Sequence, residues 1–122
     1  KKSFNWNYAV YSHDGSVKTR LNPIEWAKKA ESIGAGELLL TSIDRDGTWK
    51  GFDLEVIKKI TSAVSIPVIA NGGAGSINDI RKVVKEANAS AVALGSMVVY
   101  QQKGMGVLIN FPDRLELQKV IN

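Results

Sequence analysis

Short apolar segments alternate along this chain with amphipathic segments of helical length, and this alternation limits the possible folds more than any other feature. The apolar segments are Glu37–Thr41 (ELLLT), Pro67–Ala70 (PVIA) and Ala91–Leu94 (AVAL). Near-continuous apolarity is typical of strands that are buried on both faces. Strands that alternate with helices indicate βα units. The sequence therefore predicts an α/β fold with parallel strands and crossover helices.

Capping residues mark the ends of the expected helices, since a polar cap or a proline favours a helix start and glycine favours a stop. Three helices are expected: one from Pro23 after an Asn22 cap to Gly34, one from an Asp53 cap to Ala63, and one from Ser76 to about Glu86.

The two ends of the chain differ from this repeating pattern. Trp6–Tyr11 and Val17–Thr19 flank a turn at residues 13–16, which predicts a β-hairpin. Towards the other end, glycines break the chain before a short apolar run at Val107–Ile109, and Pro112-Asp113 is expected to open a last helix. No linker is visible, so we expect a single domain over residues 1–122.

Composition excludes several classes of function. The chain has 122 residues, no cysteine, one histidine and a net charge of +4. It therefore offers no thiolate or histidine cluster for a metal, and we expect no metal and no cofactor. The lysines are scattered, with no basic stripe, which argues against nucleic acid. No apolar run approaches a membrane span and no export signal opens the chain, so a cytoplasmic location is expected.

The loops that follow the expected strands carry the residues of interest, because ligands of parallel βα folds gather at the carboxyl ends of the strands. Gly72, Gly73 and Gly75 follow the second strand, and Gly95-Ser96 follow the third. Glycines near helix starts let backbone N–H groups approach an anion, which predicts a phosphate site. Alternatively, the glycines only permit tight turns and Ser96 is an ordinary helix N-cap.

The loop after the first strand contains Asp44, Arg45 and Asp46. A carboxylate at a strand end can move protons or hold a substrate hydroxyl, and Asp46 is the better candidate. The alternative is a local ion-pair network that stiffens the loop. The single histidine, His13, lies in the predicted hairpin turn, and we assign it no catalytic role.

These motifs together resemble one enzyme family. Residues 34–48 (GAGELLLTSIDRDGT), 51–53 (GFD) and 70–75 (ANGGAG) are similar to the cyclase subunit of imidazole glycerol phosphate synthase, an enzyme of histidine biosynthesis. The likeness covers roughly residues 10 to 98. The related isomerase of the same pathway typically has Gly-Pro-Asn where this chain has Gly51-Phe52-Asp53, so the cyclase is favoured.

The resemblance implies a (βα)8 barrel that receives ammonia from a partner glutaminase and acts on a bis-phosphorylated ribulosyl substrate. By position, one substrate phosphate meets a backbone cup, other residues line the site, and a glutamate at the barrel floor gates the ammonia. The matching residues are Gly47, Gly72, Gly73, Gly95 and Ser96 for the cup, Thr41, Asp46 and Asn71 for the lining, and Glu37 for the gate. Alternatively, Glu37 is a solvent-facing residue at the start of its strand.

This chain has about half of the ~250 residues that a full barrel needs, and it matches the C-terminal half, with strands 6 to 8. The aspartates that the family uses at the ends of strands 1 and 5 lie outside it. We therefore expect the chain alone to be an inactive phosphate-binding module that needs an N-terminal half-barrel. The tail at residues 101–111 is similar to paralogues of surface-polysaccharide clusters, which implies ammonia supply for sugar amidination as an alternative function.

Overall fold

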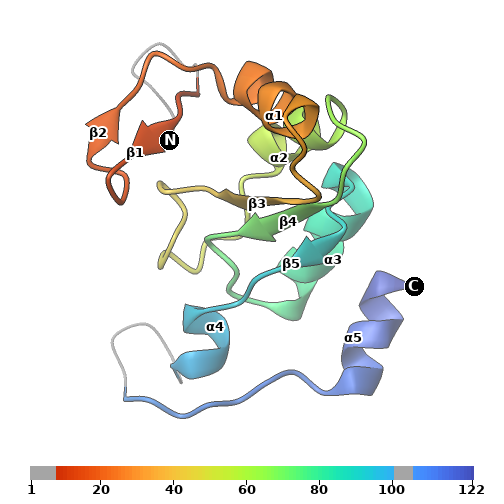
Figure 1. The fold of residues 1–122 in the computed structure, drawn as a ribbon. Coiled ribbons are helices and arrows are strands. Elements are labelled where there is room, and N and C mark those ends of the chain that lie inside the picture. The colour runs from red at the N-terminus through yellow and green to blue at the C-terminus, as the bar shows by residue number, and fades with distance from the viewer. Residues whose placement is uncertain (1–7, 101–105) are drawn as a thin grey trace.

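The computed structural model of the protein describes residues 8–100 and 106–122 (Figure 1). The first residues of the predicted hairpin, including Trp6, and the glycine break at residues 104–105 lie outside this part of the chain. The elements in chain order are β1 (Tyr11–Ser12), β2 (Val17–Lys18), α1 (Pro23–Ser32), β3 (Leu38–Thr41), α2 (Leu54–Thr61), β4 (Val68–Asn71), α3 (Ile77–Ala87), β5 (Ala91–Val92), α4 (Ser96–Val99) and α5 (Arg114–Ile121).

The predicted parallel sheet is confirmed, with the strand order β3-β4-β5. Leu39 of β3 lies level with Ile69 of β4, which in turn lies level with Ala91 of β5. The predicted strand boundaries were wrong by one or two residues. β3 begins after Glu37, β4 extends to Asn71, and β5 ends at Val92 because the chain turns there towards α4.

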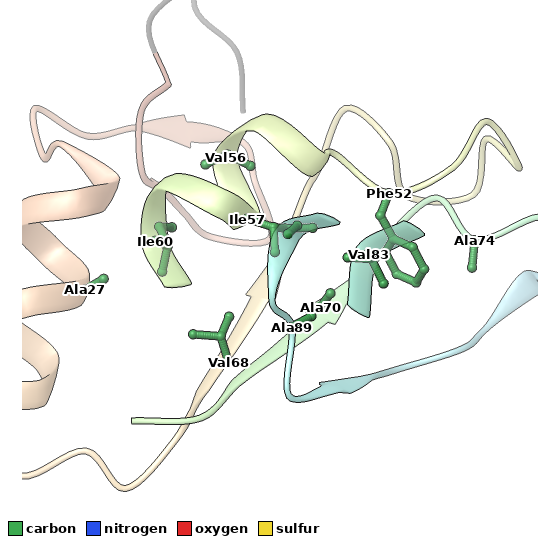
Figure 2. Close-up of a cluster of buried hydrophobic side chains, with 11 residues drawn as sticks. Ala27, Phe52, Val56, Ile57, Ile60, Val68, Ala70, Ala74, Val83 and Ala89 are labelled. Carbon is green, nitrogen blue, oxygen red and sulfur yellow. The ribbon is translucent and has the colours of Figure 1, made fainter. Parts of the chain in front are cut away.

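One face of the sheet packs against the helices and forms the core (Figure 2). Alternate strand residues face the helices, as the period of two requires. α2 lies against both α1 and α3 and contributes an apolar stripe at helical spacing. The cluster contains Ala27, Phe52, Val56, Ile57, Ile60, Val68, Ala70, Ala74, Val83, Ala87 and Ala89.

The other face of the sheet carries no helix among the described elements. Leu39 and Thr41 of β3 lie on this face, together with Ile69 and Asn71 of β4, and the side chain of Leu39 is 62% exposed. Parallel sheets usually have both faces covered. This face and the free edge of β3, which borders an open groove of about 790 Å³, are therefore surfaces that a larger assembly would bury.

Two of these three predicted helix caps are confirmed by side-chain hydrogen bonds, and the third is confirmed in position only. The Asn22 side chain accepts from the N–H groups of Ile24 and Glu25, and Ser76 accepts from Asp79 N–H. Asp53 occupies the N-cap position of α2 but makes no capping bond with its side chain. Its carboxylate instead accepts from the Tyr8 hydroxyl at 2.9 Å.

The hairpin lies against the loop that follows β3. Its turn contains Gly15, which has a φ of +83°, and a Cβ at that position would be 3.0 Å from Cδ1 of Ile43. At the other end of the chain, Asp113 caps α5 as the sequence predicted. α5 packs against α3, and the Lys85 ammonium donates to the carbonyl of Asn122.

Candidate functional site

A small pocket lies where the carboxyl ends of the parallel strands bring three loops together. Most of the predicted site residues line it, and Thr41, Glu37 and Gly75 do not. The lining residues are Asp46, Gly47, Asn71, Gly72, Gly73, Ala74, Ala93, Gly95 and Ser96. The parallel direction of the strands accounts for this meeting, because it places all three following loops at one edge of the sheet.

The wall made by Gly72, Gly73 and Ala74 contains unpaired backbone donors. All three residues are buried, yet their N–H groups donate to no acceptor in the described part of the chain. Buried backbone N–H groups are almost always paired, with protein, water or a ligand. A row of such donors in a pocket suits an anion with several acceptor oxygens, such as phosphate.

Gly75, which we grouped with these glycines in the sequence, has a different role. Its N–H donates to Oδ2 of Asp79 at 3.1 Å, so it is not available to an anion in this arrangement. Asp79 was missed in the sequence, although the spacing Ser76-x-x-Asp79 is that of a capping box and could have indicated it.

The glycines are also required by the packing of the loops on one another. Gly72 and Gly73 have φ values of +92° and +103°, which favour glycine. A Cβ on Gly72 would lie 2.8 Å from Ser42 O, and one on Gly73 would collide with Gly51 O. The tight-turn alternative is therefore correct in part, because these glycines serve the contact between two loops whether or not an anion binds.

Ser96 is not the helix cap that we considered as an alternative role. Gly95 holds the N-cap position of α4, and Ser96 is the first helical residue without a side-chain capping bond. In the described chain the N–H groups of Gly95 and Ser96 also lack protein acceptors. They therefore add two free donors from a second loop that lines the pocket.

Asp46 lies on a loop that backbone hydrogen bonds hold in place, between the small pocket and the groove beside β3. The N–H groups of Arg45 and Asp46 both donate to Ser42 O, at 3.0 and 2.9 Å. The Arg45 guanidinium donates to the carbonyl of Lys50 and, among the described residues, forms no ion pair with Asp44 or Asp46. Among the described residues, the alternative of an ion-pair network centred on Arg45 is thus not what the structure shows. The exposed Asp46 borders both the small pocket and the groove beside β3.

Thr41 and Asn71 end neighbouring strands in register and are joined by a hydrogen bond. The Asn71 amide donates to Oγ1 of Thr41 at 3.0 Å. Because the hydroxyl oxygen accepts this bond, its own hydrogen is directed elsewhere and can donate to a ligand. Thr41 borders the groove, whereas Asn71 borders the small pocket.

Glu37 lies at the other end of the same strand, away from the pocket. It directly precedes β3 and is exposed. Thr41 lies four positions further along the chain, or about 13 Å away at ~3.3 Å per residue. Because side chains alternate along a strand, Glu37, Leu39 and Thr41 belong to the same uncovered face. Glu37 is therefore not part of the pocket itself.

Comparisons with known proteins decide the family. Residues 2–104 match the model of the family described as "Histidine biosynthesis protein". The chain belongs to this family. The resemblance that the sequence motifs indicated is thus confirmed, and the sheet and its crossover helices are part of a (βα)8 barrel.

Individual relatives carry the name of one enzyme of that family. The imidazole glycerol phosphate synthase subunit HisF of Saccharolobus solfataricus is 52% identical over 74% of this chain and 36% of its own length. The subunit HisF of Alkaliphilus metalliredigens is 46% identical over 84% of this chain and 40% of its own.

A Pseudomonas aeruginosa protein with the provisional name of imidazole glycerol phosphate synthase subunit hisF2 is 45% identical over 93% of this chain and 45% of its own length. The chain therefore spans less than half the length of the curated relatives it matches.

In the described part of the chain, no helix combines the length and the apolar character needed to cross a membrane.

Proposed function

We propose that this chain belongs to a barrel that acts as the cyclase subunit of imidazole glycerol phosphate synthase. That barrel would add ammonia to a bis-phosphorylated ribulosyl intermediate. It would split the product into imidazole glycerol phosphate and an aminoimidazole carboxamide ribotide. The observation that carries the proposal is the row of buried, unpaired N–H groups at Gly72–Ala74 beside the carboxylate of Asp46. The names of the relatives support the same activity.

In this proposal the small pocket holds one substrate phosphate. Gly72, Gly73, Gly95 and Ser96 line it from two loops with N–H groups that have no acceptor among the described residues, and Gly47 borders it on the third. Neutral backbone donors that are already in place bind an anion without any large rearrangement, and this positions the substrate for reaction. The phosphate would thus fix one end of the substrate.

Asp46 is then placed to act on the remainder of the substrate. It separates the phosphate pocket from the groove beside β3, so a substrate held by its phosphate would extend past this carboxylate. We propose that Asp46 takes part in proton transfer or holds the group that does. Thr41 and Asn71 would orient the same part of the substrate by hydrogen bonds.

Catalysis would also need groups from outside this chain. General acid and base groups act as a pair across a reacting centre, and the described residues offer only Asp46 at the meeting point of the pocket and the groove. We therefore propose that an N-terminal half-barrel completes the active site and that the chain alone binds phosphate without turnover. A glutaminase would supply ammonia at the opposite face, where Glu37 lies at the start of β3.

A second candidate is ammonia supply for sugar amidination in surface-polysaccharide synthesis. One observation favours it: the tail at residues 101–111 resembles paralogues of surface-polysaccharide clusters. Turnover of the ribulosyl substrate by the completed barrel would support the cyclase. Glutamine-dependent ammonia release without such turnover would support the second candidate.

A matched pair of substitutions in the completed barrel tests the role of Asp46. Asp46→Asn should lower kcat at least about tenfold with little change in KM, because a proton-transferring carboxylate acts mainly in the transition state. Asp44→Asn, in the same loop but away from the small pocket, should stay close to the parent enzyme. Steady-state kinetics with ammonium salts would measure both. Equal losses in the two variants would reduce Asp46 to a structural loop residue.

A further inference from the structure

The side chain of Asp79 lies between two of the three loops that build the proposed phosphate pocket. It lies in the first turn of α3. Its Oδ2 atom accepts from Gly75 N–H at 3.1 Å and from the Ser76 hydroxyl at 2.9 Å. Its Oδ1 atom faces Gly51, where a Cβ would lie only 3.1 Å away. One half-buried carboxylate thus accepts hydrogen bonds from the loop after β4 and lies next to Gly51 at the end of the loop after β3.

Gly51 is linked to the phosphate pocket by a backbone hydrogen bond. Gly51 N–H donates to Gly73 O at 2.7 Å, a short bond between the two loops. A Cβ built on Gly72 would in turn lie 3.4 Å from the N and Cα atoms of Asp46. Any displacement of one loop therefore changes the position of the free donors relative to the Asp46 carboxylate.

Asp79 does not itself border the pocket. Because its carboxylate is turned towards Gly75, Ser76 and Gly51, it accepts bonds that orient the glycine loop without offering its charge to the anion. It also takes up the Gly75 N–H, which leaves Gly72, Gly73 and Ala74 as the free donors of that loop.

We propose that Asp79 is a positioning residue that holds the glycine loop after β4 in register with the Asp46 loop, and so sets the geometry of the phosphate pocket. The part that concerns phosphate rests on the proposed function. The part that concerns the register of the loops does not. A residue that only capped α3 would stabilise the helix and leave both the pocket and Gly51 unaffected.

Three variants of the 122-residue chain separate these roles. Asp79→Ala removes the acceptor, Asp79→Asn keeps one acceptor oxygen without the charge, and Asn22→Ala removes a cap of similar kind from α1, far from the pocket in sequence. Inorganic phosphate is the probe, with affinity measured by calorimetry. Amide hydrogen exchange at Gly51 and Gly75 reports the register of the loops without any ligand.

Asp79→Ala should weaken phosphate binding roughly 5- to 30-fold, as expected when one or two hydrogen bonds to a charged group are lost. It should also speed exchange at both Gly51 and Gly75. Asp79→Asn should restore most of the affinity and of the protection. Asn22→Ala should lower the thermal midpoint comparably while binding phosphate within about twofold of the parent chain.

The results distinguish failure of the positioning role of Asp79 from failure of the proposed phosphate pocket. Unchanged exchange at Gly51 in Asp79→Ala would overturn the proposal, whether or not phosphate binds. Phosphate binding by the parent chain with equal affinity in Asp79→Ala would overturn its second half. If the parent chain bound no phosphate while Gly51 lost protection in Asp79→Ala, the proposed phosphate pocket would fail but the positioning role of Asp79 would stand.

Discussion

Glycines of the pocket can serve the packing of the loops, the binding of an anion, or both. The atoms that an added Cβ would meet distinguish these roles. At Gly73 a Cβ would collide with Gly51 O, so any larger residue there disturbs the contact between the loops before it affects a ligand. At Gly95 a Cβ would meet no protein atom within 4 Å, but its φ of −116° and ψ of −95° lie outside the main regions that residues other than glycine occupy. A larger residue at Gly95 therefore strains its own backbone, whereas at Gly73 it also disturbs the contact between the loops.

Gly95→Ala should weaken binding of inorganic phosphate about fivefold or more and should also lower the thermal midpoint, because alanine is strained at this φ and ψ. The added methyl group would meet no protein atom within 4 Å and would lie at a residue that borders the pocket. Gly36→Ala is the matched control, because its Cβ would also meet open space and it does not border the pocket. Titration calorimetry on both variants would decide. Equal affinities would remove residues 95–96 from the proposed site.

Residue identity predicted part of this site from the sequence alone. The loops after the strands and the glycines of the phosphate pocket could be predicted because strand ends and glycines can be recognised in the sequence. Asp79 and the Gly51–Gly73 bond were not found, since they depend on which loops meet in space. Asp53 illustrates the opposite error: its spacing predicted a cap, but a tyrosine from another segment engages its carboxylate.

Among the elements, α2 is joined at its start to the segment before the hairpin. The Tyr8 hydroxyl donates to Asp53 Oδ1 at 2.9 Å and to Glu55 Oε2 at 3.1 Å, and the ammonium of Lys59 lies 5.7 Å from the centre of the Tyr8 ring. Burial raises the pKa of Tyr8 above its ordinary value, and the bonds and charges of the two carboxylates raise it further. The protonated hydroxyl therefore helps to hold these elements together.

This link makes stability sensitive to alkaline pH. The unfolded chain ionises Tyr8 near pH 10, whereas the folded chain keeps it protonated to higher pH. The contribution of Tyr8 is thus complete below about pH 10 and is lost as the pH rises towards the folded value. Tyr8→Phe should lower the free energy of unfolding by about 1 kcal/mol at pH 7 and should make its decline above pH 10 less steep. Urea unfolding at pH 7 to 11 would test this, and parallel curves would contradict it.

The element boundaries show how far local signals extend. Helices α1 and α3 begin where their caps predicted, because a cap acts through neighbouring residues only. The ends of the strands were predicted less well, since pairing between strands decides them. β4 includes Asn71 because Asn71 pairs with Thr41 of β3. These two residues are thirty positions apart in the sequence.

At the scale of the whole molecule, the uncovered sheet face is the feature that most needs another chain segment. Leu39 is 62% exposed in the middle of this face, with Glu37 before β3 at one end and Thr41 at the other. In a closed barrel this face becomes the interior, so these residues would line a path from the floor to the mouth. The sequence predicted the half-barrel from length and family resemblance, but the exposure of Leu39 became visible only in the structure.

This arrangement leads to a prediction for the completed barrel with its proposed glutaminase. Ammonia that is kept from water must enter at the face opposite the active-site loops, where Glu37 lies. Glu37→Ala should then lower product formation from glutamine by about tenfold relative to glutamine hydrolysis. Activity with ammonium salts should stay within about twofold, because free ammonia reaches the open mouth directly.

The control for this experiment is Glu25→Ala, which removes an exposed carboxylate from α1 whose one ion pair among the described residues is with Lys28 on the same helix. Such a surface pair contributes little to stability, so both ammonia sources should remain equally effective in that variant. Parallel assays of glutamate release and product formation would measure the coupling. If Glu37→Ala lost activity equally with glutamine and with ammonium salts, Glu37 would support folding only, and ammonia would have to reach Asp46 by another route.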